Sequence, residues 1–385
     1  MTICFFSAQY LPTVGGVERY TYNLAQRSAA AGHRVLVVTS ALPGLPARET
    51  SPEGIEVFRF PVLPLMRGRF PVLKPGRALR ALAEELWGSG IDFCVINTHF
   101  YTNSIYAARQ ARRRNIRRIV IEHGSAYLMT GPAPLRWAGA LYEQAAARLL
   151  RRWAPDFYGV SSACCRWLLR FGIQAKGCLY NAVDPKDVRA QAQKAAVDWR
   201  VRLGIPSSMP LIAYAGRILP EKGVDALAAA LPAIRAAVPG ACAVLVGDGP
   251  LLPSLREKQI EGLYLPGQAP YAHTLALLAQ ADLFCMPSRS EGFSCTVLEA
   301  AALGCPIVTT ATGGSPELLS DEFHGLLLPG RSAAEVANAC IRALQDASWR
   351  ETAARNTAYR LEQSFTWQAA AARFLALAEG QNKDV

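Results

Sequence analysis

Strand-like and helix-like segments alternate along this sequence in two successive rounds, and that alternation constrains the fold more than any other feature. In the first round, short apolar runs predict strands at 2–7, 34–39, 93–97, 118–121 and 157–160. Amphipathic segments predict helices between them, at 17–31, 79–87, 104–114 and 135–152. Strands that alternate with helices pair in parallel, so this half of the chain is expected to form a sheet with helices on both faces.

The same alternation restarts after a polar, helix-prone stretch at 184–203. Strands are predicted at 211–216, 241–246, 263–265, 283–286 and 307–310, with helices between them, and only helices are predicted from there to the end. Because the pattern begins afresh, we expect a second doubly wound α/β domain. The boundary between the two domains is placed near 181–194.

The chain is long and apolar enough to bury two cores, since 51% of its 385 residues are hydrophobic and 18% are charged. This balance excludes an intrinsically disordered chain. No apolar stretch reaches the length of a membrane span, and Met1 leads directly into the first predicted strand, so neither a span nor a signal peptide is expected. The ten cysteines show no C-x-x-C spacing, which predicts neither a disulfide framework nor a zinc site. The expected location is the cytoplasm.

Positive charge is concentrated in the first half of the chain. Residues 1–185 hold 23 Lys and Arg against 11 Asp and Glu, whereas residues 186–385 hold 18 against 19. The densest basic segments are 66–80, 109–118 and 148–152. A basic face of this kind suits an anionic membrane, an acidic substrate or nucleic acid. The alternative is that these residues form the solvated faces of ordinary surface helices.

Several enzyme classes are disfavoured by motifs that the sequence lacks. It has no G-x-G-x-x-G after a strand, no P-loop, no G-x-S-x-G and no H-E-x-x-H, which argues against dehydrogenases, P-loop ATPases, α/β-hydrolases and zinc proteases. It also lacks the D-x-D triplet with which metal-dependent sugar transferases of another fold hold a divalent cation. We therefore expect neither a required metal nor a cofactor.

Two glycine-containing loops follow predicted strands, at the edge where open α/β sheets bind ligands. The first contains Gly15 and Gly16 and opens a helix, whose N-terminal amides favour anions. A plain tight turn is the alternative for this loop. The second is GRILPEKG at 216–223, in which Arg217 and Lys222 are spaced to close on a diphosphate from two sides. Its alternative is a solvated loop.

Two further segments also follow predicted strands. VGDGP, at 246–250, is equally well explained as a purely structural turn. EGFSCTVLE is more specific, because its two glutamates, Glu291 and Glu299, lie roughly 12 Å apart when measured in helical rises. That spacing is comparable with the reach from hexose to ribose in a nucleotide sugar. The flanking apolar residues predict that both carboxylates are buried and need partners such as vicinal hydroxyls, with two surface glutamates as the alternative.

Taken together, these segments resemble a known enzyme family. The Gly-Gly loop, GRILPEKG, VGDGP and PSRSEGFSCTVLEAAALGCPIVTTATGGSPELL are similar to the family-4 retaining glycosyltransferases (glycosyl transferases group 1), whose fold is GT-B. The resemblance spans nearly the whole chain and implies two Rossmann-like doubly wound parallel-sheet domains that face a central cleft. Residues 1–185 would bind the acceptor, with a C-terminal helix at about 366–385 packing back on them, and residues 186–365 would bind the nucleotide-sugar donor.

The resemblance also implies roles for individual residues. Arg217 and Lys222 would neutralise the donor diphosphate, with Gly216 in the same loop. The backbone of Gly15 and Gly16 would approach the same phosphates.

The transferred sugar and the nucleoside would be held by other positions. Glu291 would bind hydroxyls of the sugar, together with the backbone amides of Gly292, Phe293 and Ser294. His123 would face the sugar from the N-terminal domain, and His99 is a second candidate for that role. Glu299 would bind the ribose hydroxyls, and Gly267, after Pro266, would lie against the base.

In this family the anomeric configuration is retained, and the departing diphosphate takes the acceptor's proton. The resemblance therefore implies a metal-independent hexosyltransferase that uses a UDP- or GDP-sugar. The expected acceptor is a glycan or a polyprenyl- or lipid-linked molecule. Because the first half of the chain is basic and contains aromatic residues, an anionic membrane surface is a second expected partner. Such an enzyme would act in bacterial surface polysaccharide or lipopolysaccharide assembly, in the cytoplasm or peripherally on the inner face of the plasma membrane.

Three other functions stay open. A sugar-nucleotide epimerase of the same fold and a catalytically idle nucleotide-sugar-binding protein would share the donor site. A nucleic-acid-binding protein would explain the arginine clusters, but the sequence contains no recognised binding motif, so nucleic acid is not expected as a partner.

Overall fold

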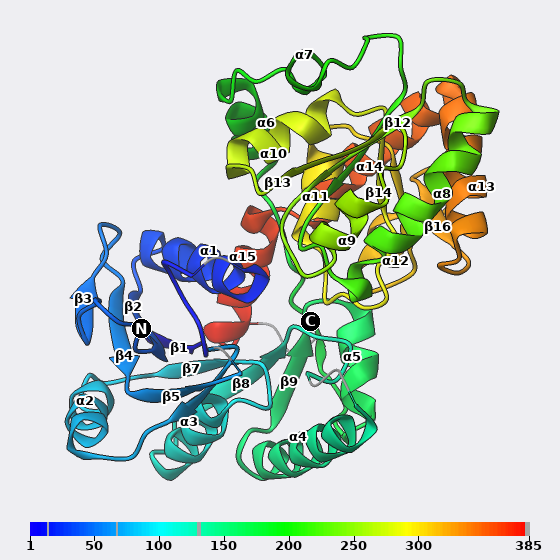
Figure 1. Ribbon diagram of the computed structural model, residues 1–385. Coiled ribbons are helices and arrows are strands. Elements are labelled where there is room, and N and C mark those ends of the chain that lie inside the picture. Colours follow the sequence, from blue (N-terminus) through cyan, green and yellow to red (C-terminus); the bar gives the residue numbers. More distant parts are fainter. Residues whose placement is uncertain (14, 67, 129–131, 382–385) are drawn as a thin grey trace. The chain divides into compact units, whose positions relative to one another are not determined.

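The computed structural model describes residues 1–13, 15–66, 68–128 and 132–381. Val14, in the first glycine loop, and Arg67, in the basic segment 66–80, lie outside the described residues. Contacts within the chain divide it into two units (Figure 1). The first unit is Met1–Asn181 together with the C-terminal segment from Ala370, and the second is Ala182–Ala369.

The first unit is built on an eight-stranded sheet with the order β10-β9-β8-β7-β1-β2-β4-β3. Its strands are β1 (Thr2–Phe6), β2 (Arg34–Ser40), β3 (Arg48–Thr50), β4 (Glu56–Phe60), β7 (Phe93–Asn97), β8 (Arg117–Glu122), β9 (Asp156–Gly159) and β10 (Gly177–Cys178). The strands pair in parallel apart from β3, which runs antiparallel to β4. Apolar runs such as those of β1 and β7 are buried because helices cover both faces of a parallel sheet.

The helices of the first unit are α1 (Gly16–Ala30), α2 (Arg77–Trp87), α3 (Thr102–Arg113), α4 (Ala133–Trp153), α5 (Ser162–Leu169) and most of α15 (Trp367–Ala378). Figure 1 shows α1 and α15 on one side of the sheet and α2, α3 and α4 on the other. The predicted α/β class is confirmed, and the expected strands and helices of this half are present within a few residues of their predicted ends.

The sequence prediction missed β4 and its neighbours, which include the hairpin β5 (Val62–Leu65) and β6 (Phe70–Leu73). The reason is that β4 carries charged residues inside a sheet. Arg59 is only 2% exposed, and its guanidinium is compensated by Glu49 of β3 at 2.5 Å. A buried arginine with a carboxylate partner is tolerated, but hydrophobic periodicity does not reveal it.

The second unit is built on a six-stranded parallel sheet with the order β13-β12-β11-β14-β15-β16. Its strands are β11 (Leu211–Ala215), β12 (Cys242–Val246), β13 (Leu263–Gly267), β14 (Leu283–Met286), β15 (Ile307–Thr310) and β16 (Leu326–Leu328). The expectation of helices alone after 310 was wrong, because β16 is too short to show a periodic pattern. The strand order reverses between β11 and β14, and ligands of open α/β sheets bind beside such a reversal.

The helices of the second unit are α6 (Pro185–Lys194), α7 (Trp199–Leu203), α8 (Val224–Ala237), α9 (Leu252–Glu257), α10 (Tyr271–Gln280), α11 (Cys295–Ala302), α12 (Ser315–Leu318), α13 (Ala333–Gln345) and α14 (Ala347–Ser364). Helices α8 and α13 pack together against one face of the sheet, and α10 and α11 lie on the other (Figure 1). Within the described residues, every helix is too short or too polar to cross a lipid bilayer.

The C-terminal helix α15 contributes to the core of the first unit. Phe374 has no exposed surface, and its ring lies 5.5 Å from that of Phe5 and 6.2 Å from that of Phe93. Arg117 donates hydrogen bonds to the carbonyls at the end of the helix, at 2.7 Å for Leu377 and 3.0 Å for Ala378. The last helix and the first strand are therefore parts of one core.

Replacing Phe374 with alanine should destabilise the first unit, because the substitution removes the packing against Phe5 and Phe93 and leaves a cavity. We expect Phe374→Ala to lower the free energy of unfolding by about 3–5 kcal/mol. Chemical denaturation measures this loss. Tyr359→Ala is the control, since Tyr359 is 67% exposed on α14. Equal stability of the two variants would contradict the assignment of α15 to this core.

Candidate functional site

Two loops meet at the strand-order reversal of the second sheet. One follows β11 and contains GRILPEKG, and the other follows β14 and leads through Glu291 into α11. Since the two strands are parallel neighbours, their carboxyl ends lie at the same edge. The backbone amide of Arg289 donates to the carbonyl of Glu221 at 2.7 Å, which ties the loops together.

Lys222 and Glu291 form an ion pair across these loops. The Lys222 ammonium lies 2.6 Å from Oε1 of Glu291, and the two side chains are only 18% and 9% exposed. The Ser288 hydroxyl donates to the same carboxylate oxygen at 2.7 Å, and the Thr310 hydroxyl donates to the Ser288 carbonyl at 2.6 Å. A partly buried pair with these additional hydrogen bonds fixes the position of both charges.

The loops approach so closely that glycine is required. Gly223 has φ +71°, and a Cβ there would lie 2.1 Å from the carbonyl oxygen of Pro287. Gly247, after β12, has φ +147°, and a Cβ there would lie 1.8 Å from the carbonyl oxygen of Gly216. The glycines of GRILPEKG and VGDGP therefore let three neighbouring strand ends pack backbone against backbone.

Glu299 lies on α11 and is 4% exposed. Its Oε1 accepts a hydrogen bond from the hydroxyl of Tyr271, the first residue of α10, at 2.8 Å. The chain from Glu291 to Ser294 is a loop and α11 begins at Cys295, so Glu291 precedes the helix and Glu299 lies within it. Burial of both carboxylates also agrees with the sequence.

The remaining predicted positions of this unit differ in exposure. Arg217 is exposed, and among the described residues its guanidinium has no ion-pair or hydrogen-bond partner. Its backbone carbonyl accepts a hydrogen bond from the Tyr214 hydroxyl at 2.9 Å. Phe293 is 5% exposed and packs edge-on against Phe365 at 5.2 Å. Its ring is structural, and only its backbone faces the loop. Gly267 ends β13, and its carbonyl accepts from Gly247 at 2.9 Å.

In the first unit, Gly15 and Gly16 lie at the N-terminus of α1. Gly15 caps the helix in an extended conformation, and Gly16 is its exposed first residue. The Glu18 carboxylate lies beside them, since a Cβ on Gly15 would be 2.3 Å from its Oε2. An acidic residue in the first turn stabilises the positive end of a helix, and it would compete there with a bound anion.

His123 directly follows β8 and is partly buried. Its Nε2 donates to Oδ1 of Asn97 at 2.8 Å, and the ring of Tyr20 meets it edge-on with centroids 4.8 Å apart. Burial lowers the pKa of His123 to about 4, although the nearby Glu122 carboxylate acts in the opposite direction. The imidazole is therefore neutral at neutral pH. It can contact a polar ligand without repelling or attracting it by charge.

His99 does not match its expected role, because it has no exposed surface. It lies between two buried carboxylates, those of Glu122 and Glu143. No sequence pattern predicts this arrangement, because the three residues come from three separate segments of the chain. His123 is thus the histidine at this edge that a ligand can reach.

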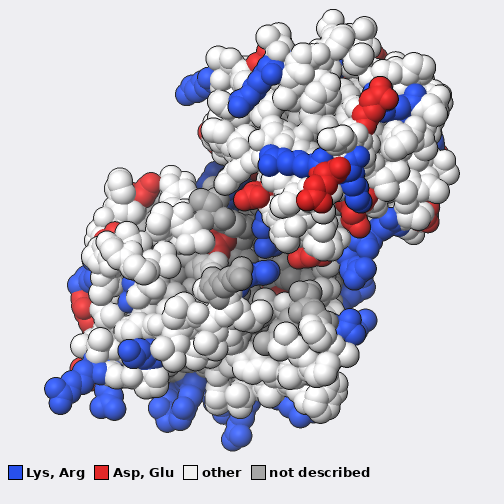
Figure 2. Space-filling view, viewed as in Figure 1, with Lys and Arg blue, Asp and Glu red and all other residues white. Residues whose placement is uncertain are grey.

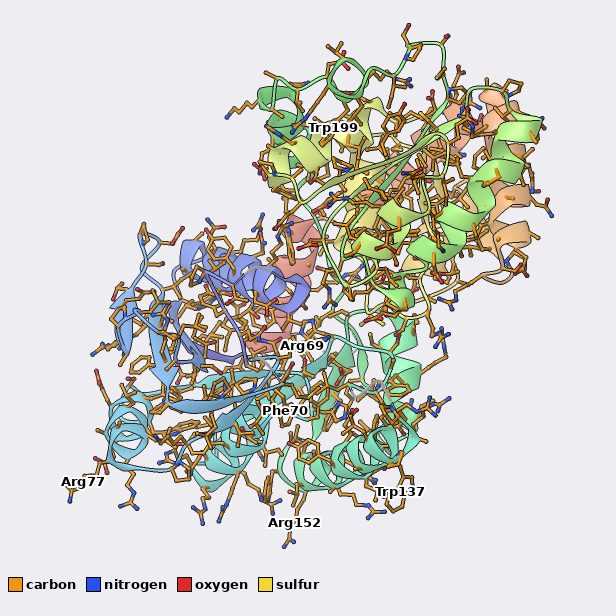
Figure 3. All side chains as sticks on the ribbon, viewed as in Figure 1. Arg69, Phe70, Arg77, Trp137, Arg152 and Trp199 are labelled. Atoms are coloured by element: carbon orange, nitrogen blue, oxygen red, sulfur yellow. The ribbon has the colours of Figure 1, made fainter. Side chains whose placement is uncertain are left out.

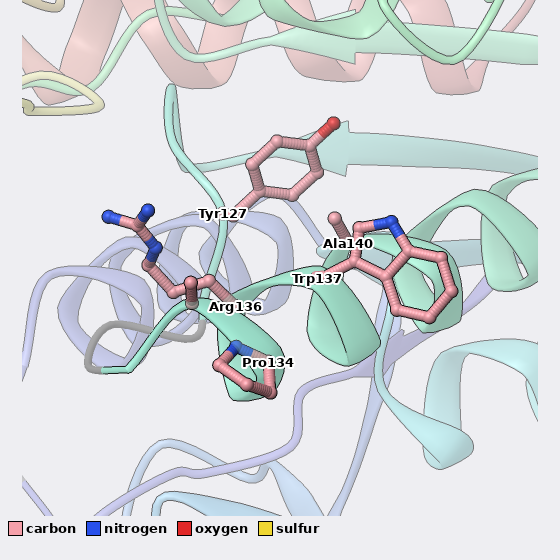
Figure 4. Close-up of a pocket in the computed structure, with 6 residues that line it drawn as sticks. Tyr127, Pro134, Arg136, Trp137 and Ala140 are labelled. Carbon is pink, nitrogen blue, oxygen red and sulfur yellow. The ribbon is translucent and has the colours of Figure 1, made fainter.

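An open pocket lies where the chain enters α4 (Figure 4). Its volume is about 780 Å³, and it is lined by Tyr127, Ala133, Pro134, Arg136, Trp137 and Ala140. The lining is mostly apolar, and Arg136 provides a positive charge. Among the described residues, no group of three or more His, Cys, Asp or Glu side chains is placed to hold a metal ion.

Three residues that contact the predicted glutamates or support such a contact were not predicted: Ser288, Thr310 and Tyr271. Ser288 and Thr310 lie at the carboxyl ends of β14 and β15, so their position after predicted strands was an available signal. Tyr271 carried no such signal. It contacts Glu299 across 28 residues of sequence, and only the packing of α10 against α11 brings the two together.

The chain is similar to two known protein families. Residues 14–187 match the family model Glycosyltransferase Family 4, and residues 209–346 match the family model Glycosyl transferases group 1. Together the two matches take in most of both units. The first match ends at residue 187, shortly after the boundary between the units, and the second begins at residue 209.

The chain is also similar to individual proteins and solved structures. A GDP-mannose-dependent alpha-(1-6)-phosphatidylinositol monomannoside mannosyltransferase of Mycobacterium tuberculosis is 36% identical over 172 residues, which is 40% of this chain and 43% of that relative. The match thus spans less than half of the mannosyltransferase. Sucrose-phosphate synthase of Thermosynechococcus elongatus superposes with a TM-score of 0.78 at 22% identity and 98% coverage of both chains. HepE of Anabaena, solved in complex with UDP-glucose, superposes with a TM-score of 0.74 at 20% identity, over 99% of this chain and all of that one. At these identities, the superpositions establish the fold.

Gly223→Ala should destabilise the second unit more than an ordinary glycine substitution does. Gly204→Ala is the matched control, because Gly204 also has positive φ, +65°, but has open space around its Cβ position. We expect the control to lose about 1 kcal/mol from backbone conformation alone. Gly223→Ala should lose clearly more, because its Cβ meets the Pro287 carbonyl. Equal losses in chemical denaturation would show that the two loops are not in close contact.

Proposed function

Since the chain belongs to the glycosyltransferases of GT-B fold, with Glycosyltransferase Family 4 and Glycosyl transferases group 1 domains, we propose that it transfers a hexose-type sugar with retention of configuration. The donor is a UDP- or GDP-sugar, and the acceptor is a glycan or a lipid-linked glycan of surface polysaccharide or lipopolysaccharide assembly. The observation that carries the proposal is the Lys222–Glu291 pair at the strand-order reversal of the second sheet.

The donor diphosphate is assigned to Arg217 and Lys222. An ammonium group has three N–H donors, and Lys222 uses one of them for its hydrogen bond to Glu291. Its position is therefore fixed while donors remain for phosphate oxygens. Arg217 adds an exposed guanidinium five positions earlier in the same loop, suited to a bidentate contact with phosphate. The backbone of Gly216 borders the same loop.

The sugar and the ribose are assigned to the two buried glutamates. Glu291 and the amides of Gly292, Phe293 and Ser294 lie ahead of the α11 N-terminus, where donors face outward. Glu299, already paired with a tyrosine hydroxyl, accepts ribose hydroxyls in the same way. Gly267, at the end of β13, is the backbone position assigned to the base. Support for a nucleotide-sugar donor comes from HepE with UDP-glucose and from the GDP-mannose-dependent relative.

The reaction follows from the charges assigned to the site. The bond between the anomeric carbon and the diphosphate oxygen breaks, and the acceptor oxygen forms a bond to that carbon on the same face. The acceptor's proton passes to the departing diphosphate. Arg217 and Lys222 stabilise the charge that develops on this leaving group, which is an electrostatic role prepared before the reaction begins. Because two side-chain cations take this role, the proposal needs no metal ion.

In the first unit, His123 is the proposed contact to the transferred sugar, as a neutral imidazole oriented by Asn97. Gly15 and Gly16 are proposed to approach the phosphates through their backbone. The Glu18 carboxylate lies beside Gly15. For the phosphates to contact this backbone, that carboxylate must move away, or the phosphates must bind on the side of Gly15 that faces away from Glu18.

Arg217→Ala and Lys222→Ala should each lower kcat/KM for the donor by about two decades or more, at roughly 1.4 kcal/mol per decade. Release of nucleoside diphosphate from each common nucleotide sugar, with acceptor extracts and in EDTA, measures this loss. Lys258→Ala, which removes an exposed lysine at the end of α9, is the control. Wild-type turnover in either variant would overturn the assignment. Nucleotide binding without any transfer would favour an idle binding protein, and interconversion of the free nucleotide sugar would favour an epimerase.

A lipid-linked acceptor at an anionic membrane is supported by the surface of α4. Trp137 and Leu141 are 68% and 50% exposed, and Arg148 and Arg152 follow at spacings that place them on the same helix face. Figure 2 shows Lys and Arg side chains projecting along the edge of the first unit where α2, α3 and α4 lie, and Figure 3 places Trp137 and Arg152 at that edge. Exposed aromatic and basic side chains on one helix face are typical of helices that lie at a membrane surface.

Trp137→Ser should weaken binding to vesicles rich in phosphatidylglycerol by about tenfold, because it removes most of the apolar area that enters the interface. Co-sedimentation at low salt measures the bound fraction, which should fall further as salt screens the arginines. Phe323→Ser is the matched control, since Phe323 is 58% exposed in the second unit. If the wild-type protein is not retained by these vesicles, the membrane part of the proposal is wrong.

A further inference from the structure

A histidine is enclosed between two buried carboxylates in the first unit. His99, just after β7, has no exposed surface, and its Nδ1 lies 2.5 Å from Oε2 of Glu122, the last residue of β8. On the other side, its Nε2 lies 4.0 Å from Oε2 of Glu143 on α4. Both glutamates are 1% exposed. A charged cluster of this kind is costly to bury and needs compensating contacts.

The same carboxylates hold the segment that carries His123. Oε1 of Glu122 accepts from the backbone amides of His123 at 3.1 Å and Gly124 at 3.0 Å. Oε1 of Glu143 accepts from the amide of Leu128 at 2.8 Å. The segment 123–128 is therefore attached to a carboxylate at each end, and His99 lies between the two carboxylates.

Two atoms of the cluster lack a hydrogen-bond partner in the part of the chain that the structure describes. They are Nε2 of His99 and Oε2 of Glu143, and both are shielded from solvent. They face each other, and a single proton between them would satisfy both, whichever of the two carries it. A small rotation of either side chain closes the 4.0 Å gap. Orphaned buried atoms that face each other indicate a shared proton.

The two carboxylates differ in their preference for that proton. Burial alone would raise the pKa of Glu122, but His99 and the Gly124 amide hold it below its usual value, so Glu122 is the anion that keeps a proton on Nδ1 of His99. Burial raises the pKa of Glu143 to about 7, although the Leu128 amide and His99 oppose this shift. The side of the cluster that titrates near neutral pH is therefore the side that faces Glu143.

The other groups around the cluster keep their protonation state near neutral pH. Burial raises the pKa values of Tyr101, Tyr142 and Cys164 to about 12. His123 acts on Glu122, and Glu18 and Arg69 act on Tyr101. Glu143 is therefore the group of this cluster whose pKa lies near neutral pH.

We propose that His99 and Glu143 share one proton and that, together with Glu122, they form a positioning device for the segment 123–128 that presents His123 to the substrate. His99, Glu122 and Glu143 are positioning residues, because none of them has a surface that a ligand can touch. The functional half of this inference rests on the proposed transferase activity. The proton-sharing half does not, so the two are tested by separate measurements.

The sign of the pH dependence follows from the pKa of Glu143. Its pKa in the folded protein, about 7, is higher than the ordinary 4.5 of a glutamate. Its contribution to stability is therefore fully present below about pH 4.5 and is lost as the pH rises through about 7. Glu143→Gln cannot ionise and keeps the acceptor for the Leu128 amide. The melting temperature of the wild type should fall relative to that of Glu143→Gln as the pH rises from 5 to 8.

Proton sharing is measured by NMR on protein labelled with nitrogen-15 in its five histidines. The His99 signals are those that are missing from the spectrum of His99→Gln. In the wild type, these signals should include a slowly exchanging Nδ1–H, and the chemical shift of Nε2 should change with pH near 7. In Glu143→Gln that change should be absent between pH 6 and 8. The same pH-dependent change in Glu143→Gln and in the wild type would overturn the proposal.

Positioning is measured by the kinetics of sugar transfer. Glu143→Ala, which removes the acceptor for Leu128, should lower kcat by about ten- to a hundredfold with the donor KM nearly unchanged. Glu143→Gln should restore kcat and flatten its pH profile between 6 and 8. His33→Gln is the control, since His33 also faces a glutamate, Glu379 at 3.5 Å, but precedes β2 and so lies at the opposite edge of the sheet.

The outcomes separate the two claims. Unchanged kcat in a folded Glu143→Ala would overturn the positioning role even if the NMR result stands. Failure of Glu143→Gln to rescue would show that the carboxylate acts by some means other than its hydrogen bonds. A wild type without transfer activity would contradict the proposed function, whereas the NMR comparison would still decide whether the proton is shared.

Discussion

The ion pair between Lys222 and Glu291 is the contact on which the second unit's site depends. It joins the loops on either side of the strand-order reversal, and it is supported by Ser288, which Thr310 holds in turn. The close backbone approach at Gly223 makes the short loop geometry possible. Because the pair is largely buried, the ammonium is fixed before any ligand arrives, and a preformed cation is what a diphosphate leaving group requires.

The first unit uses the opposite charge for a similar purpose. Its buried carboxylates, Glu122 and Glu143, organise a loop by accepting backbone N–H bonds, and His99 lies between them. His123 is left neutral and oriented by Asn97. In both units, therefore, buried charges hold loops at the carboxyl ends of parallel strands, where the strand order alone brings those loops together.

Much of the fold followed from the sequence, because parallel strands buried on both faces appear as uninterrupted apolar runs. The charged strand β4 was missed because it has no such run, and β16 was missed because its apolar run, Leu326–Leu328, has only three residues. Among site residues, Lys222, Glu291 and Glu299 were found individually from their motifs. The contacts of Lys222 with Glu291 and of Tyr271 with Glu299 were not predicted, because they join distant segments through packing that no local pattern encodes. The placement of Glu291 in a loop and of Glu299 in the following helix agrees with the sequence prediction.

The central claim is that the second unit binds a nucleoside diphosphate at Lys222, and the unfolding temperature with UDP, GDP, ADP and CMP in EDTA tests it most directly. A ligand at 100 times its Kd adds about 2.7 kcal/mol of stability. The account predicts that UDP or GDP alone raises the unfolding temperature of the wild type, and that Lys222→Ala abolishes the increase while keeping its fold. An absence of any increase with all four nucleotides, or an undiminished increase in Lys222→Ala, would contradict it.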